Sequence, residues 1–117
     1  MEMDKNIQKK IIHNFFRARI ENHRTEYVHP SYQLEKKLLT AIRLQNETEA
    51  LKTLREINRE QRAKLSPNSL RSLKNSLICS CAIFTRAAIE GGLHPEIAYN
   101  LSDVLIQEIE TFEDMKK

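Results

Sequence analysis

The sequence predicts an all-α protein, a single helical bundle of five or six helices with a central apolar helix. The chain of 117 residues contains only two glycines and three prolines, so few positions interrupt helices. Apolar residues recur at intervals of three and four through most of its length. This length suffices to bury one hydrophobic core, and we expect one domain over residues 1–117.

The first helix is predicted from about Asp4, its expected N-cap, to Asn22. Its apolar positions follow helical spacing, with a second row that widens the stripe: Ile7, Ile11, Phe15 and Ala18, then Ile12, Phe16 and Ile20. The segment from His23 to Ser31 contains Pro30 and has no period, so it reads as a connector.

Two further helices are expected to form an antiparallel hairpin. Apolar residues from Leu34 to Ile42 predict a helix that ends near Asn46, which we expect to take a left-handed conformation. The third helix would start at Glu47 or Thr48 and continue to Leu65. The turn between the two helices is very short, which favours the hairpin.

The fourth helix is expected to be the centre of the fold. It should open on Ser66-Pro67, run almost entirely apolar from Leu77 to Ile89, and end at Gly91-Gly92. Neighbouring helices must cover such a helix, and we expect the first and the last helix on its flanks. Pro95 restarts the chain as a first-turn residue, and Ser102-Asp103 is interpreted as a fresh cap that splits the remainder into two helices.

Charge is distributed unevenly along the chain. The net charge of +3 combines a basic first part with an acidic end: residues 93–117 carry six acidic against two basic side chains. Between Arg86 and Lys116 the sequence contains no lysine or arginine. A helix in this region is therefore poorly suited to contact the phosphates of DNA.

Several functional classes are disfavoured by composition. No apolar run approaches the roughly 20 residues that cross a bilayer, and the first residues lack a signal-peptide pattern, so we expect a cytoplasmic protein without a membrane partner. Cys79 and Cys81 are expected to be buried small hydrophobic residues. The four histidines have no metal-ligand spacing, and no catalytic constellation is recognisable, so we expect no metal, no cofactor and no enzyme activity.

The second half of the chain contains a series of distinctive motifs: Arg71-Ser72-Leu73-Lys74-Asn75, Arg86-Ala87-Ala88-Ile89-Glu90-Gly91-Gly92, Pro95, Ala98-Tyr99, Leu101-Ser102-Asp103 and Ile109-Glu110. These motifs resemble the helical region that precedes the DNA-binding domain in AraC-type bacterial transcription regulators. The upstream stretch from Tyr27 to Ala63 resembles the same region more loosely. The string that runs from Arg86 to Gly92 is the most specific of them.

The resemblance implies an intracellular regulator, usually a dimer, that grips operator DNA through a C-terminal pair of helix-turn-helix units. This chain reaches Lys117, about where that DNA-binding half would begin, so the family's DNA-contacting residues have no counterpart here. We therefore expect a regulatory or dimerisation domain, a linker or sensor, that controls an attached helix-turn-helix domain. A homodimer is expected, DNA would be bound only through the attached domain, and a small-molecule effector is a minority reading.

Two alternative functions remain open. The hairpins could form a groove for a partner helix, which would make the chain a stand-alone helical interaction module. Residues 87–101 could instead form a small helix-turn-helix, but the helix that would read the bases offers Glu96 where Arg, Lys, Asn or Gln is needed.

Four side chains are candidate contacts for a ligand or partner. Arg86 and Glu90 are spaced for an ion pair on the apolar helix, and we expect a partly buried pair, with contact to an acidic ligand as the sharper alternative. Tyr27 and Tyr32, with Phe15 and Phe16, could line an effector groove where the first helix meets the connector, although core packing is the default for such residues. Gly91, Gly92 and Pro95 are expected to form a structural turn.

Overall fold

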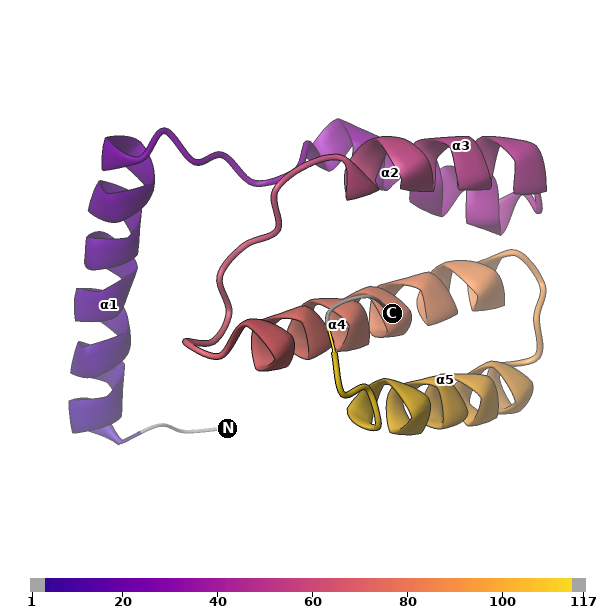
Figure 1. Ribbon diagram of the computed structural model, residues 1–117. Coiled ribbons are helices and arrows are strands. Elements are labelled where there is room, and N and C mark those ends of the chain that lie inside the picture. Colours follow the sequence, from indigo (N-terminus) through magenta and orange to yellow (C-terminus); the bar gives the residue numbers. More distant parts are fainter. Residues whose placement is uncertain (1–3, 115–117) are drawn as a thin grey trace.

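The computed structural model describes residues 4–114, and within this range all regular structure is α-helical (Figure 1). The five helices are α1 (Lys5–Arg24), α2 (Tyr32–Arg43), α3 (Glu47–Asn58), α4 (Ser69–Glu90) and α5 (Pro95–Glu110). The predicted all-α class is confirmed.

Four of the helices form two hairpins that pack on each other. Helix α3 packs on α2, α5 packs on α4, and α2 joins the hairpins by packing on α4. Helix α1 stands apart from them in the described structure (Figure 1). The radius of gyration is 16.5 Å, above the roughly 13 Å of a compact 100-residue domain. The prediction that the first helix flanks the fourth is therefore wrong.

Every helix begins at a side chain that accepts a hydrogen bond from a backbone N–H of the first turn. The capping residues are Asp4, Ser31, Asn46, Asn68 and His94. Asp4 and Pro95 start their helices as expected. Helix α4, however, starts after Asn68, whose Oδ1 accepts from the N–H of Arg71 at 2.8 Å, and not at Ser66-Pro67. Asparagine and serine are both favoured N-caps, and in this structure it is the asparagine oxygen that binds a first-turn N–H.

Helices α1, α2 and α4 end in the same Schellman motif. In each, one residue takes a positive φ and the next N–H bonds back to a carbonyl five residues earlier. The positive-φ residues are Glu26 (58°), Gln45 (59°) and Gly92 (113°). The expectation for Asn46 is wrong, because Gln45 takes the left-handed conformation and Asn46 serves as the cap of α3.

Two predicted helix boundaries differ from the structure. Helix α3 ends at Asn58, not Leu65, and the N–H of Leu65 bonds to Ser72 Oγ at 2.8 Å and not to a helical carbonyl. Helix α5 is continuous through Ser102, so the predicted split is absent. Ser102 is buried against α4, its Oγ 3.6 Å from Cys81 Sγ, and this contact replaces a capping role.

The core is small and the apolar helix α4 is only partly covered. Its buried residues are Cys81, Thr85 and Ala87, and the core is otherwise made by Leu38, Ala41 and Ala98. Cys79 is exposed, so the expectation that both cysteines are buried holds for Cys81 alone. Only α2 and α5 pack on α4, so apolar side chains on and around α4 stay accessible to solvent.

An ion pair fastens each hairpin. In the first hairpin, Lys37 Nζ lies 3.1 Å from a carboxylate oxygen of Glu49, and this hydrogen bond raises the pKa of Lys37. In the second, Arg71 lies 2.8 Å from Glu110, and its hydrogen bond lowers the pKa of the Glu110 carboxyl. Lys74 Nζ also donates to the Glu110 carbonyl at 2.7 Å. The start of α4 is thus tied to the end of α5, and the two helices run antiparallel.

Candidate functional site

A large hollow lies between the two hairpins, and we name it the interhairpin groove. It has a volume of about 610 Å³ and is lined from α2, α3, α4, α5 and the segments next to α3 and α5. Its apolar wall includes Leu54, Leu77, Phe84, Leu101, Leu105 and Phe112. A volume and lining of this kind are typical of binding sites for apolar groups.

The helix packing explains why the groove exists. Helix α2 packs on α4, whereas α3 reaches only α2, so the inner side of α3 faces α4 and α5 across a gap. Leu54 and Ile57 therefore face Leu77 and Phe84 without filling the space between them. Leu101 keeps 53% of its surface exposed and Leu105 keeps 46%. Both leucines recur at the helical spacing of a core stripe, but they form an open wall.

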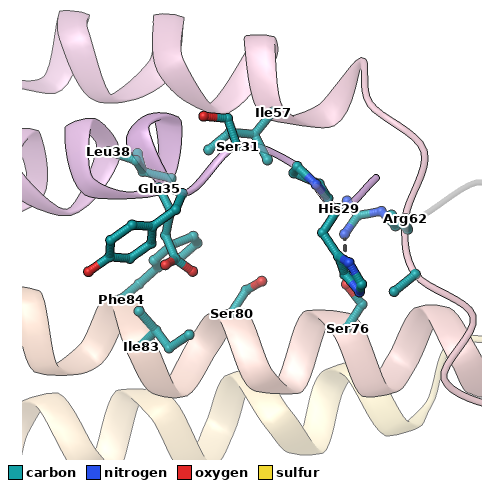
Figure 2. Close-up of a pocket in the computed structure, with 13 residues that line it drawn as sticks. His29, Ser31, Glu35, Leu38, Ile57, Arg62, Ser76, Ser80, Ile83 and Phe84 are labelled. Carbon is teal, nitrogen blue, oxygen red and sulfur yellow. Dashed lines mark hydrogen bonds between the residues drawn. The ribbon is translucent and has the colours of Figure 1, made fainter. Parts of the chain in front are cut away.

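A second hollow, the polar pocket, adjoins the groove. It has a volume of about 320 Å³ and shares with the groove a wall made by Ile57, Arg62, Ser80 and Phe84. Figure 2 shows Arg62 and Ser76 at one end of this pocket and Phe84 toward the other. The Arg62 guanidinium donates to Ser76 Oγ at 3.0 Å and to Asn58 Oδ1 at 3.1 Å, which holds its charge in place. The pocket thus combines a fixed cation with an apolar wall.

The four aromatic residues expected to share a groove are not brought together. Tyr32 lines the polar pocket. Tyr27 lies outside it and donates its hydroxyl hydrogen to the Gln61 carbonyl at 3.1 Å, and burial, with a smaller effect of Glu60, raises the pKa of the Tyr27 phenol. Phe15 and Phe16 pack edge to face on each other, 5.4 Å between ring centres, on the isolated helix α1. The predicted groove between α1 and the connector is therefore incorrect.

The predicted buried pair of Arg86 and Glu90 is also wrong. Both side chains are exposed, and the ion pairs of residues 4–114 do not include them. Arg86 lies over the ring of Tyr99, with 5.2 Å between the guanidinium carbon and the ring centre. Arg86 and Glu90 both line a shallow hollow beside Leu39. This side of α4 is uncovered, so water solvates the charges and burial does not force them to pair.

The turn between α4 and α5 contains the predicted residues and also contacts the end of α2. Gly91 caps α4, Gly92 has the positive φ of the Schellman motif, and Pro95 opens α5. Gly91 also touches the end of α2: a Cβ at Gly91 would collide with the carbonyl oxygen of Arg43. Gln45 Nε2 donates to the Gly91 carbonyl at 3.0 Å. Gly91 therefore joins the two hairpins.

The described residues provide two further negative findings. Within residues 4–114, no helix is both long and apolar enough to cross a bilayer. The same residues contain no group of three histidine, cysteine, aspartate or glutamate side chains placed to hold a metal ion.

Comparison with protein-family models, with curated proteins and with solved structures finds no match for this chain. The resemblance to AraC-type regulators therefore stays a prediction.

Proposed function

We propose that this chain is a regulatory interaction domain whose interhairpin groove binds an amphipathic helix of a protein partner. The observation that carries the proposal is the apolar groove of about 610 Å³, which the chain's own helices leave unfilled. An apolar helix face laid into such a groove is a recurrent mode of peptide recognition. A second copy of the chain and a different protein would both satisfy this proposal.

The resemblance to AraC-type regulators supports a more specific form of the proposal. The residues that carry it, Arg71 to Glu110, make up α4 and α5, which form one side of the groove. In this form the chain is a cytoplasmic, non-enzymatic domain that controls an attached helix-turn-helix domain, and occupancy of the groove sets the state of that domain. DNA would be bound only through the attached part.

The packing of α4 and α5 argues against direct DNA reading. The hydrogen bonds of Arg71 and Lys74 to Glu110 hold the two helices side by side along their length, whereas helix-turn-helix units cross at about 90–120°. Helix α5 also carries four acidic side chains and no basic one. Its charge would repel the phosphates of a duplex.

A synthetic peptide tests the groove without assuming a natural partner. The probe is a peptide of leucine and lysine whose leucines recur at helical spacing, and the control is a scrambled peptide of the same composition. Titrated into the full chain, the probe should shift the amide NMR resonances of Leu54, Leu101 and Leu105, and the scrambled peptide should not. Equal effects of both peptides, or shifts confined to other surfaces, would contradict groove binding.

The regulatory form of the proposal has a separate test. The full chain would be fused to a helix-turn-helix domain that represses a reporter gene only when the fused partner makes it dimerise or changes its conformation. A Leu101→Asp variant, which places a charge in the groove, should change repression, and Asn100→Asp, an exposed neighbour, should not. Equal repression by the two variants would remove the groove from regulation.

The polar pocket favours a second candidate function, the binding of a small-molecule effector. A fixed guanidinium at Arg62, the carboxylate of Glu35 and the ring of Phe84 line one hollow, a combination suited to a compound with an aromatic group and both charges. The probe is phenylalanine. It should raise the melting temperature of the full chain and lose this effect in an Arg62→Met variant. No rise in the unmodified chain would remove this candidate.

A further inference from the structure

Helix α1 carries a long row of uncovered apolar side chains. Its isoleucines and phenylalanines keep between 49% and 68% of their surfaces exposed, and none of its residues is buried. The exposed residues are Ile7, Ile11, Ile12, Phe15, Phe16 and Ile20. A continuous exposed stripe of this kind marks a surface that binds another apolar surface.

The junction after α1 directs this helix away from its own groove. The Schellman motif at Glu26 fixes the end of α1 through hydrogen bonds from Glu26 to His23 and from Tyr27 to Asn22. The very next residue, Tyr27, is anchored by its hydroxyl to Gln61. Figure 1 shows α1 standing beside the hairpins, separate from them and running across the direction of their helices. These hydrogen bonds hold α1 in a position in which none of its residues lines its own groove.

Helix α1 and helix α5 carry net charges of opposite sign. Helix α1 carries six lysines and arginines against one glutamate. Helix α5, a wall of the groove, carries four acidic side chains and no basic one. Leu101 and Leu105 line the groove, and Glu108 follows them by seven and three residues, which puts it beside them on the same face of α5. A basic apolar helix laid on α5 would therefore gain both apolar burial and ion pairs.

We propose that the occupant of the interhairpin groove is α1 of a second copy of this chain, in a reciprocal dimer in which each copy donates α1 and receives that of its partner. A two-fold axis lets both contacts form at once, which closes the assembly. This inference rests on the proposed function of the groove and names its occupant.

The test combines two full-chain variants that each damage one half of the contact. Phe15→Glu alters the stripe of α1, and Asn6→Glu, with the same change in charge on the polar side beside Lys9 and Lys10, is the control. Leu101→Asp alters the groove, and Asn100→Asp is its control. Sedimentation equilibrium should show a dimer for the unmodified chain and both controls. Phe15→Glu and Leu101→Asp should each raise the dissociation constant of the dimer at least about tenfold.

Mixing Phe15→Glu with Leu101→Asp shows whether α1 binds the groove of a second copy or the groove of its own chain. The intact α1 of Leu101→Asp can enter the intact groove of Phe15→Glu, so the mixture should recover a heterodimer held by one of the two contacts. A mixture that stays monomeric, or an unmodified chain that is monomeric at the highest concentration reached, would overturn the proposal.

Two further outcomes separate this inference from the proposed function. If the leucine-lysine peptide binds the groove while the chain stays monomeric, the groove has its proposed function but α1 is not its occupant. If the chain stays monomeric and α1 instead binds vesicles containing phosphatidylserine, with binding lost in Phe15→Glu, α1 is a membrane-surface helix and the dimer proposal fails.

Discussion

Gly91 touches the backbone of Arg43 so closely that a Cβ at position 91 would collide with the Arg43 carbonyl oxygen and lie 3.0 Å from its carbonyl carbon. This contact is where the end of α2 meets the end of α4, and therefore where one hairpin meets the other. Any side chain at position 91 would push the hairpins apart and change the width of the groove between them.

The first prediction concerns the two glycines of this turn. Gly91→Ala should lower the free energy of unfolding by about 1–3 kcal/mol, because the new methyl group meets backbone that cannot move aside. Gly92→Ala meets no atom within 4 Å, and its positive φ should cost only about 1 kcal/mol. Urea unfolding of both variants measures the difference, and a Gly91→Ala variant as stable as the unmodified chain would refute the close contact.

The second prediction concerns two buried threonines. Thr53 on α3 is fully buried, and its hydroxyl has no hydrogen-bond partner among the described residues. Thr53→Val should therefore raise the free energy of unfolding by about 1 kcal/mol, because an unsatisfied polar group is removed. Thr85 donates to the Cys81 carbonyl at 2.7 Å, so Thr85→Val should lower that free energy by about 0.5–1 kcal/mol. The same sign for both variants in urea unfolding would contradict this account.

The third prediction concerns the left-handed residue at the end of α2. Gln45→Gly and Gln45→Ala both lose the hydrogen bond to the Gly91 carbonyl. Only glycine relieves the positive φ, so the glycine variant should be more stable than the alanine variant by about 1 kcal/mol. Thermal unfolding of the pair measures the difference directly. Equal stability would mean that position 45 is not left-handed in solution.

The fourth prediction concerns pH and the Arg71–Glu110 pair. The pKa of Glu110 lies below its ordinary value of 4.5, so the pair adds stability above that pH and loses it as the pH falls through the lowered pKa. Glu110→Gln should melt slightly earlier than the unmodified chain at neutral pH and low salt, and the two should converge in acid. Added salt should shrink the difference, because the pair is exposed.

Glu113→Gln is the matched control for this pair. Glu113 is exposed and forms no ion pair within residues 4–114, so this variant removes the same charge without breaking the pair. A melting temperature lowered equally by both variants would point to net charge and not to the contact with Arg71.

The helix positions were largely predictable from the sequence, and the reasons are local. Asp4, Pro95 and the glycine pair each satisfy or remove a backbone group at a helix end, and such signals depend on a few neighbouring residues. The left-handed Gln45 was not predictable, because glutamine carries no signal for positive φ. The end of α3 was missed because Leu65 fits the apolar spacing of the helix, although the backbone is no longer helical after Asn58.

The groove could not be predicted from the apolar pattern, because that pattern is the same whether a stripe is covered by its own chain or by another. Leu101 and Phe15 both recur at core spacing, yet both remain about half exposed. Only the arrangement of the hairpins shows that α3 leaves α4 and α5 uncovered. The separation of Tyr27 from Tyr32 likewise depends on a long-range contact to Gln61.

Hydrogen exchange at increasing protein concentration tests the central claim most directly. Most of the stability of a helix in a protein comes from packing of its apolar face, and α1 packs on no other helix, so α1 amides should exchange fast in dilute solution. They should become protected together with the amides of α5 as the concentration rises. Protection of α1 that is independent of concentration would indicate docking within one copy, and an α1 that stays unprotected throughout would contradict the account.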